Sequence, residues 1–95
     1  MSAYFVANIR IHDQKEYDKY LASVDDVFAK FNGKYLAVDE HPCVLEGNWD
    51  YTKVVLIEFP SDKELRAWYE SEEYQMILKH RLRGAHCDSL LVKGS

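Results

Sequence analysis

The stretch Thr52-Lys53-Val54-Val55-Leu56-Ile57-Glu58-Phe59 decides how this chain folds, because it is the most strand-like segment of the sequence. Side chains alternate between the two faces of a strand, so the stretch divides into two sets. One set is Lys53, Val55, Ile57 and Phe59, and the other is Val54, Leu56 and Glu58. Both sets are largely apolar, which predicts a central strand covered on both faces.

The residues before this strand predict a strand, a helix and a second strand. Residues 3–11 are rich in Val, Ile, Tyr and Phe, which is typical of a strand. Asp13, followed three residues later by Glu16, forms a capping box, and apolar residues then recur at helical spacing. Residues 34–41 predict the second strand, and residues 44–46 predict a short continuation of it beyond a proline.

The residues after the central strand predict an interrupted helix and a final strand. Ser61 and Glu64 form another capping box. Ser71, with two acidic residues behind it, resembles a fresh N-cap, so we expect the helix to break or kink there. Gly84 ends the helix, and residues 86–92 predict the last strand.

The resulting order, β-α-β-β-α-β, matches the split β-α-β plan in a single domain that covers residues 1–95. Right-handed crossovers place both helices on one face of a four-stranded antiparallel sheet. The other face is also expected to be apolar, because alternate residues of the first and last strands extend it: Tyr4, Val6, Leu90 and Val92. A second copy of the same sheet is the simplest cover for such a face, so we expect a homodimer.

The composition argues against several classes of partner. Hydrophobic residues make up 47% of the 95 residues, as in globular domains, and the net charge of −4 argues against nucleic acid, which requires a clustered basic surface. An RNA-recognition module shares the predicted topology, but residues 52–59 lack its basic-Gly-aromatic pattern. The sequence has no apolar run of membrane-spanning length, no signal-peptide pattern and no cysteine framework. We therefore expect a cytoplasmic protein with no membrane partner.

Several segments together resemble one bacterial family. They are Ala3-Tyr4-Phe5-Val6-Ala7-Asn8-Ile9, Tyr17-Asp18-Lys19-Tyr20, Val44-Leu45-Glu46-Gly47-Asn48-Trp49, Val55-Leu56-Ile57-Glu58-Phe59-Pro60-Ser61, Ala67-Trp68-Tyr69, Ser71-Glu72-Glu73-Tyr74 and Arg81-Leu82-Arg83. The chain resembles the uncharacterised "domain of unknown function 1330" family, DUF1330, along nearly its whole length. The resemblance implies a ferredoxin-like protomer in a dimeric α+β barrel, and it implies no established activity. The wider superfamily includes antibiotic-biosynthesis monooxygenases, muconolactone isomerases, haem-degrading enzymes and stress-responsive proteins, an analogy of fold only.

Three residues of the interrupted helix are the first candidates for a site: Trp68, Tyr74 and Arg81. Tyr74 and Arg81 lie seven residues apart, so they share a helix face. In a cleft between helix and sheet, Arg81 beside the Tyr74 hydroxyl could hold a carboxylate or an enolate-like oxygen. The alternative is that both aromatic residues belong to the core and that Arg81 reaches solvent or pairs with Glu58 or Asp88.

Glu58 is a further candidate, because a carboxylate among apolar neighbours must be paired or becomes a candidate general base. Asn8 and Arg10 share a face of the first strand, and one of them could partner Glu58 if the first and third strands are neighbours. Both are therefore candidates for ligand binding. The alternative is that Glu58 simply reaches solvent or an arginine.

Two pairs at i, i+2 spacing could orient an imidazole, namely Asp39 with His41 and His86 with Asp88. Such pairs arise often by chance and are weak signals of catalysis. His86 and Cys87 are adjacent in a strand and point to opposite faces, and no Cys-x-x-Cys or His-x-x-x-His spacing is present. We therefore expect no metal site and no cofactor.

These features predict a homodimer that binds a small aromatic or carboxylate-bearing molecule in a pocket of each protomer. The pocket would lie between the sheet and the interrupted helix, lined by Trp68, Tyr74, Arg81 and Asn8, with Glu58 nearby. Cofactor-free isomerase- or monooxygenase-like chemistry would use a carboxylate or a histidine as base and Arg81 as oxyanion stabiliser. The alternative is a non-catalytic binding or stress-responsive dimer.

Overall fold

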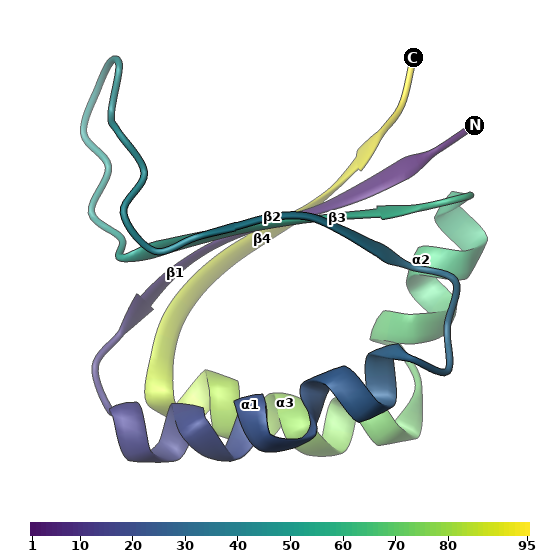
Figure 1. Ribbon diagram of the computed structural model, residues 1–95, viewed down its shortest axis with the longest axis horizontal. Helices are drawn as coiled ribbons and strands as arrows, with labels where there is room; N and C mark the ends of the chain where they lie inside the picture. Colours follow the sequence, from purple (N-terminus) through teal and green to yellow (C-terminus); the bar gives the residue numbers. More distant parts are fainter.

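The computed structural model describes residues 1–95 and contains four strands and three helices (Figure 1). In chain order they are β1 (Ala3–Ile11), α1 (Gln14–Phe28), β2 (Lys34–Asp39), β3 (Lys53–Phe59), α2 (Asp62–Tyr69), α3 (Glu72–Gly84) and β4 (Ala85–Lys93). The strands form one antiparallel sheet in the order β2-β3-β1-β4. This confirms the predicted split β-α-β plan, with β3 and β1 at the centre of the sheet.

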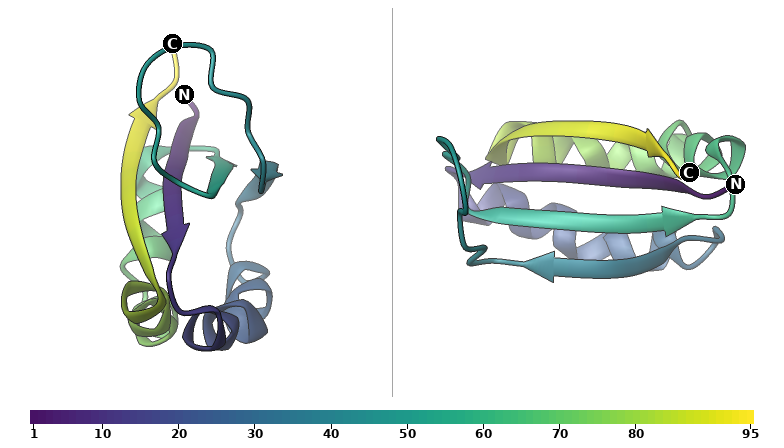
Figure 2. Two further views of the ribbon diagram at one scale, coloured as in Figure 1. Left: turned by 90° about the vertical axis from the view of Figure 1, so that its left-hand side faces the viewer. Right: turned by 90° about the horizontal axis from the view of Figure 1, so that it is seen from above.

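All three helices cover the same face of the sheet (Figures 1 and 2). α1 lies under the β2 and β3 side, and α3 lies under the β4 side. Sixteen buried hydrophobic residues form the core between the two layers. The indole of Trp68, which is 1% exposed, packs there against Phe5, Phe59 and Tyr74. None of the three helices combines the length and the apolar character that crossing a membrane requires.

Each helix begins at a capping residue that was predicted from the sequence. The side chain of Asp13 accepts a hydrogen bond from the backbone N–H of Glu16 at 3.3 Å, at the start of α1. Ser61 and Ser71 do the same at the starts of α2 and α3, with distances of 3.2 and 3.1 Å. Because the cap at Ser71 satisfies backbone donors of a new helix, the expected interruption is a true break between two helices.

The pairing of β1 with β3 sorts the alternating side chains onto two faces. Phe5 stands opposite Ile57, and both are buried under the helices. Val6 stands opposite Leu56 on the other face, which no helix covers. This uncovered surface, here called the bare face, carries six apolar side chains: Tyr4, Val6, Val54, Leu56, Leu90 and Val92. The predicted second apolar face of the sheet is therefore present.

The segment between β2 and β3 differs from the sequence prediction. Residues 44–46 form no strand, and residues 40–52 instead make one long loop that rises on the bare side of the sheet (Figure 1). β2 ends at Asp39 because the side chain of Asp39 accepts a hydrogen bond from the backbone N–H of His41 at 2.8 Å, which turns the chain. Pro42 follows and cannot donate to a ladder.

Candidate functional site

A cavity of about 400 Å³ lies between α1 and the helix-facing side of the sheet. The core-facing side chains of β1 and β3 and one face of α1 supply most of its lining, which is largely hydrophobic. Leu21, Asp25 and Val38 line it and are themselves exposed, so the cavity opens between α1 and the edge strand β2. A volume of this size lies within the range of about 300–1,000 Å³ that is typical of small-molecule sites.

Arg81 of α3 is the predicted site residue that lines this cavity. It is 3% exposed, and its Nη2 donates a hydrogen bond to the Tyr74 hydroxyl at 3.4 Å. Its guanidinium carbon lies 5.6 Å from the centre of the Tyr20 ring. Arg81 forms no ion pair with any carboxylate of the chain, neither with Glu58 nor with Asp88. The structure therefore buries a guanidinium without a counter-charge.

The tyrosines around Arg81 do not supply that charge. The hydroxyls of Tyr20 and Tyr74 share a hydrogen bond of 2.8 Å. Burial raises the pKa of Tyr20 well above its ordinary value, and burial also raises the pKa of Tyr74 although nearby Arg81 opposes this. Burial likewise raises the pKa of Tyr17 to about 12. All three phenols are neutral at physiological pH, so they stabilise Arg81 only as dipoles and aromatic rings.

Lys53 is a second buried cation on the lining of the cavity. Its Nζ donates to the Tyr17 hydroxyl at 3.3 Å and lies 5.1 Å from the centre of that ring. Burial lowers the pKa of Lys53, and the carboxylate of Glu40 opposes this only in part. The cavity thus combines an apolar wall, two cations without ion pairs and several neutral hydroxyl groups.

Trp68 and Tyr74 do not line the cavity, in contrast to the sequence expectation. Both are core residues, with 1% and 0% exposure, and their rings are 4.4 Å apart. The Nε1–H of Trp68 has no hydrogen-bond partner in the protein. As the seven-residue spacing predicted, Tyr74 contacts Arg81, and its hydroxyl accepts a hydrogen bond from the guanidinium.

Glu58, Asn8 and Arg10 lie on the opposite side of the sheet and are not brought together. Glu58 stands opposite Tyr4 on β1, four positions away from Asn8, so neither Asn8 nor Arg10 partners it. The side-chain oxygen of Asn8 accepts a hydrogen bond from Trp49 Nε1 at 3.3 Å. The sequence hypothesis depended on β1 and β3 being neighbours. They do pair, but in a register that separates these side chains.

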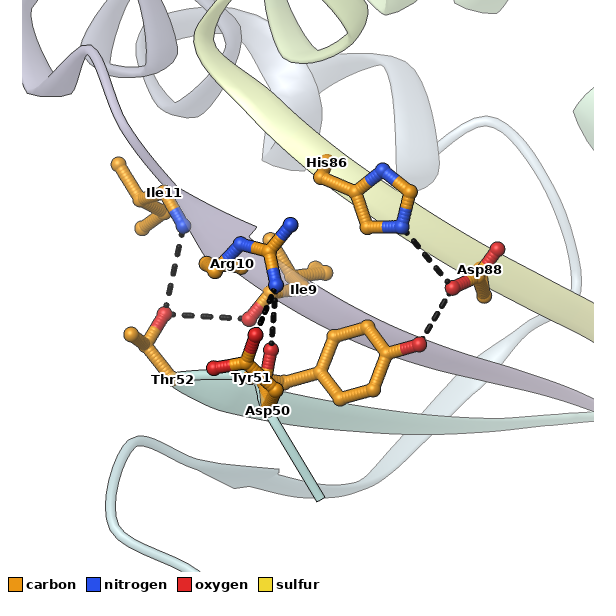
Figure 3. Close-up of polar contacts among 8 residues, drawn as sticks. All are labelled: Ile9, Arg10, Ile11, Asp50, Tyr51, Thr52, His86 and Asp88. Atoms are coloured by element: carbon orange, nitrogen blue, oxygen red, sulfur yellow. Dashed lines mark hydrogen bonds and ion pairs between the residues drawn. The ribbon is translucent and has the colours of Figure 1, made fainter. Parts of the chain in front are cut away.

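Arg10 belongs to a polar cluster that ties the 40–52 loop to the sheet (Figure 3). Its Nη1 donates to Asp50 Oδ2 at 2.6 Å. On β4, Asp88 accepts from the Tyr51 hydroxyl and contacts His86 Nε2 at 3.2 Å. These bonds, that of Tyr51 first, hold the pKa of Asp88 below its ordinary value. The predicted His–Asp contact thus exists on β4, where it is exposed and helps to fasten the loop.

Sequence reasoning missed Lys53 and the tyrosine pair of α1. A signal for Lys53 was available, because it is the first member of the alternate set that Ile57 and Phe59 place in the core. Tyr17 and Tyr20 stand three residues apart on the apolar stripe of α1, where aromatic residues normally indicate core. Their importance depends on contacts with other elements: Lys53 donates to the Tyr17 hydroxyl, and Arg81 lies over the Tyr20 ring.

Residues 2–95 match the family described as Domain of unknown function (DUF1330), and no curated protein matches the chain. RPA0582, a protein of unknown function from Rhodopseudomonas palustris, has a TM-score of 0.80 at 18% identity, covering 99% of this chain and 82% of that one. SnoaB, a cofactor-independent oxygenase from Streptomyces nogalater, has a TM-score of 0.69 at 14% identity, covering 99% and 93%. A dimeric ferredoxin-like protein of unknown function from Thermobifida fusca has a TM-score of 0.68 at 12% identity, covering 99% and 92%. At these identities the likeness shows a shared ferredoxin-like fold.

Proposed function

The chain belongs to the DUF1330 family. We propose that it works as a homodimer in which each protomer binds a small organic anion with an aromatic body. The observation that carries the proposal is the buried Arg81 guanidinium, which lines an apolar cavity and has no carboxylate partner in the chain. Arginine stays protonated in proteins, so this charge cannot be relieved by losing a proton.

A ligand carboxylate or phenolate would supply the missing counter-charge. Burying an ionised group in an apolar interior lowers the stability of the fold by roughly several kcal/mol unless the group is paired and hydrogen-bonded. The planar guanidinium suits a carboxylate because it can donate two parallel hydrogen bonds. The hydrophobic wall from β1, β3 and α1 favours an apolar, aromatic remainder of the ligand.

The bare face of the sheet supports the dimer. Its six apolar side chains are contiguous across β3, β1 and β4, and Leu90 remains 62% exposed in the single chain. The T. fusca protein with the same fold is described as dimeric. A second copy presents the same apolar surface, and a two-fold interface pairs the same patch of both subunits.

Titration of the protein with benzoate and with neutral benzamide tests the anion proposal. We expect benzoate to bind at least about tenfold more tightly than benzamide, the preference that one charge-assisted hydrogen bond provides. Arg81→Met should abolish this preference, and isothermal titration calorimetry measures the affinities. Arg83→Met is the matched control, because Arg83 is exposed on the same helix. Equal binding of benzoate and benzamide by the wild-type protein would refute the proposal.

Cofactor-independent oxygenation or isomerisation is the second candidate function, and the cation beside neutral hydroxyls favours it. Arg81 with its tyrosine neighbours is suited to stabilise a phenolate or enolate oxygen, the charge that such reactions develop. SnoaB shows that a protein of this fold is a cofactor-independent oxygenase. Oxygen consumption with chelator-treated protein and a panel of polyphenols tests the idea. Oxygen uptake that Arg81→Met eliminates would support catalysis, and reversible binding without turnover would favour the non-catalytic binding dimer.

A further inference from the structure

We propose that Lys53 is a covalent attachment site, whose amine condenses with the carbonyl group of an aromatic oxo acid bound in the cavity to form an imine. This inference rests on the proposed anion-binding function, because Arg81 would hold the acid group of the same molecule. It assigns the ligand to a narrower class, namely aromatic carboxylates that also carry an aldehyde or ketone.

The position of Lys53 sets it apart from the other lysines of the chain. It is 8% exposed and is the first core-facing residue of β3, so its side chain enters the cavity from the sheet. Lys19 and Lys30 are exposed and pair with Glu16 and Glu73. Lys53 forms no ion pair, and its polar contact is the Tyr17 hydroxyl at 3.3 Å. No carboxylate therefore contacts this amine directly and stabilises its protonated state.

The surroundings of Lys53 make its neutral, nucleophilic form more accessible than that of an exposed lysine. Burial lowers the pKa of its ammonium group, as desolvation does for lysines that form Schiff bases. The titratable and charged groups that line the spaces around it are Tyr17, Tyr20 and Asp25 of α1, Tyr35 of β2, Glu40 and His41 of the loop, His12 and Arg81. Among them Glu40 favours the charged amine, but the net effect is a lowered pKa.

Arg81 and Lys53 line the same cavity from different elements, α3 and β3. A ligand that offers a carboxylate to the guanidinium can therefore present a second group to the amine. Tyr17 contacts Lys53, and burial keeps its phenol protonated by raising the pKa to about 12. That hydroxyl is placed to hydrogen-bond the carbonyl oxygen while the amine attacks.

The step is balanced without any oxidant or reductant. The amine lone pair attacks the carbonyl carbon, a C–N bond forms, and the carbonyl π electrons move to oxygen. Both amine hydrogens leave with that oxygen as one water molecule, and the C=N double bond remains. Water reverses the reaction, so the product is a reversible adduct that cyanoborohydride traps by adding hydride to carbon while nitrogen takes a proton.

Reductive trapping with 4-formylbenzoate and sodium cyanoborohydride, followed by peptide mass spectrometry, tests the proposal. We expect modification of Lys53 to exceed that of the exposed Lys34 by at least about tenfold. Lys53→Arg should remove this adduct, and Lys53→Met should do the same. Arg81→Met should reduce the preference for Lys53, whereas Arg83→Met should leave it unchanged.

Benzoate binding, measured in parallel by calorimetry, separates the two proposals. Benzoate has no carbonyl that can form an imine, so its binding reports the anion site alone. Benzoate binding with adducts spread evenly over the lysines would overturn the role of Lys53 and leave the proposed function standing. Failure of benzoate to bind would overturn the proposed function and this inference together. Site localisation on the wild-type protein decides the outcome even if a variant at position 53 folds poorly.

Discussion

At the scale of single residues, the hydroxyl of Tyr74 links two helices and the buried charge. It shares a hydrogen bond with Tyr20 of α1 and accepts one from Arg81 of its own helix. Such bonds are stronger in a low-dielectric interior, and a buried polar group that is left without its partner lowers the stability of the fold. Tyr74 is therefore a positioning residue: it holds the guanidinium at the cavity wall without lining the cavity itself.

Tyr74→Phe should lower the free energy of unfolding by about 1–3 kcal/mol, because it leaves the Tyr20 hydroxyl and an Arg81 N–H without their buried partner. Urea denaturation measures the change. Tyr69→Phe is the matched control, since Tyr69 is half-buried and its hydroxyl makes no hydrogen bond within the protein. We expect a change of less than about 0.5 kcal/mol there. Equal losses in the two variants would contradict the network.

Residue-scale prediction from the sequence succeeded where neighbours are close along the chain. The spacing of Tyr74 and Arg81 on one helix correctly placed them in contact. It could not place Asn8 and Glu58, whose separation depends on the register of β1 against β3. Nor could it show that Arg81 lacks a carboxylate, because that fact depends on every element packed around it.

At the scale of elements, the start of α1 is packed directly on the end of α3. The backbone carbonyl of Gly84 accepts hydrogen bonds from the N–H groups of His12 and Asp13 at 2.9 and 3.0 Å. A Cβ at position 84 would lie 2.7 Å from the backbone nitrogen of Tyr17 and 2.9 Å from the carbonyl oxygen of Asp13. Only glycine allows this approach of the two backbones.

Gly84→Ala should therefore destabilise the protein by about 1–3 kcal/mol, as overpacking against rigid backbone does. Thermal unfolding measures the loss. Gly47→Asn serves as control: Gly47 has a φ of 84° with open space around it, and asparagine tolerates that conformation. An unchanged midpoint for Gly84→Ala would show that the helix pair can separate at little cost.

A second contact between the two helices gives stability a pH dependence. Glu16 of α1 meets His80 of α3 at 2.5 Å, and this bond, followed by that of Lys19, holds the pKa of Glu16 below its ordinary value of 4.5. The stabilisation is complete above pH 4.5 and is lost as the pH falls through the lower pKa of the folded state.

Glu16→Gln should thus lower stability at neutral pH and should differ little from wild type in strong acid. Urea denaturation at a series of pH values from neutral to acid follows the difference. Glu46→Gln is the control, because Glu46 lies exposed in the loop and forms no ion pair. A constant difference across the whole pH range would argue against a stabilising ionised Glu16.

The elements themselves were largely predictable because their signals are local. Each of the caps at Asp13, Ser61 and Ser71 is recognisable from a pattern of four consecutive residues, and each begins a helix in the structure. The course of the 40–52 loop was not predictable, because partners distant in the sequence determine it. Asp50 pairs with Arg10 of β1, and Tyr51 with Asp88 of β4, contacts that span the width of the sheet.

At the scale of the whole molecule, the sheet has one face under helices and one face bare (Figure 2). The bare face follows from the alternation of side chains along β3, because its two sets of side chains are both largely apolar. Edge strand β2 is exposed at every residue, so it shields neither face. The proposed assembly through the bare face would remove this apolar surface from water.

Leu90→Asp should convert the proposed dimer into a monomer of 11.1 kDa, raising the dimer dissociation constant by at least about 100-fold, because it would bury a charge in an apolar interface. Sedimentation equilibrium measures it. Leu82→Asp is the matched control, because Leu82 on α3 is 60% exposed against 62% for Leu90. Dimers that survive Leu90→Asp would place the interface elsewhere.

The cavity and the bare face use alternate residues of the same two strands, Phe5 and Ala7 of β1 for one and Tyr4 and Val6 for the other. No side chain lines both surfaces, so we expect ligand binding in the cavity and the proposed joining of two sheets to be thermodynamically independent. A mixed dimer of one wild-type and one Arg81→Met chain would then bind a single benzoate with wild-type affinity. Saturation of the wild-type dimer would be hyperbolic, with a Hill coefficient of about 1.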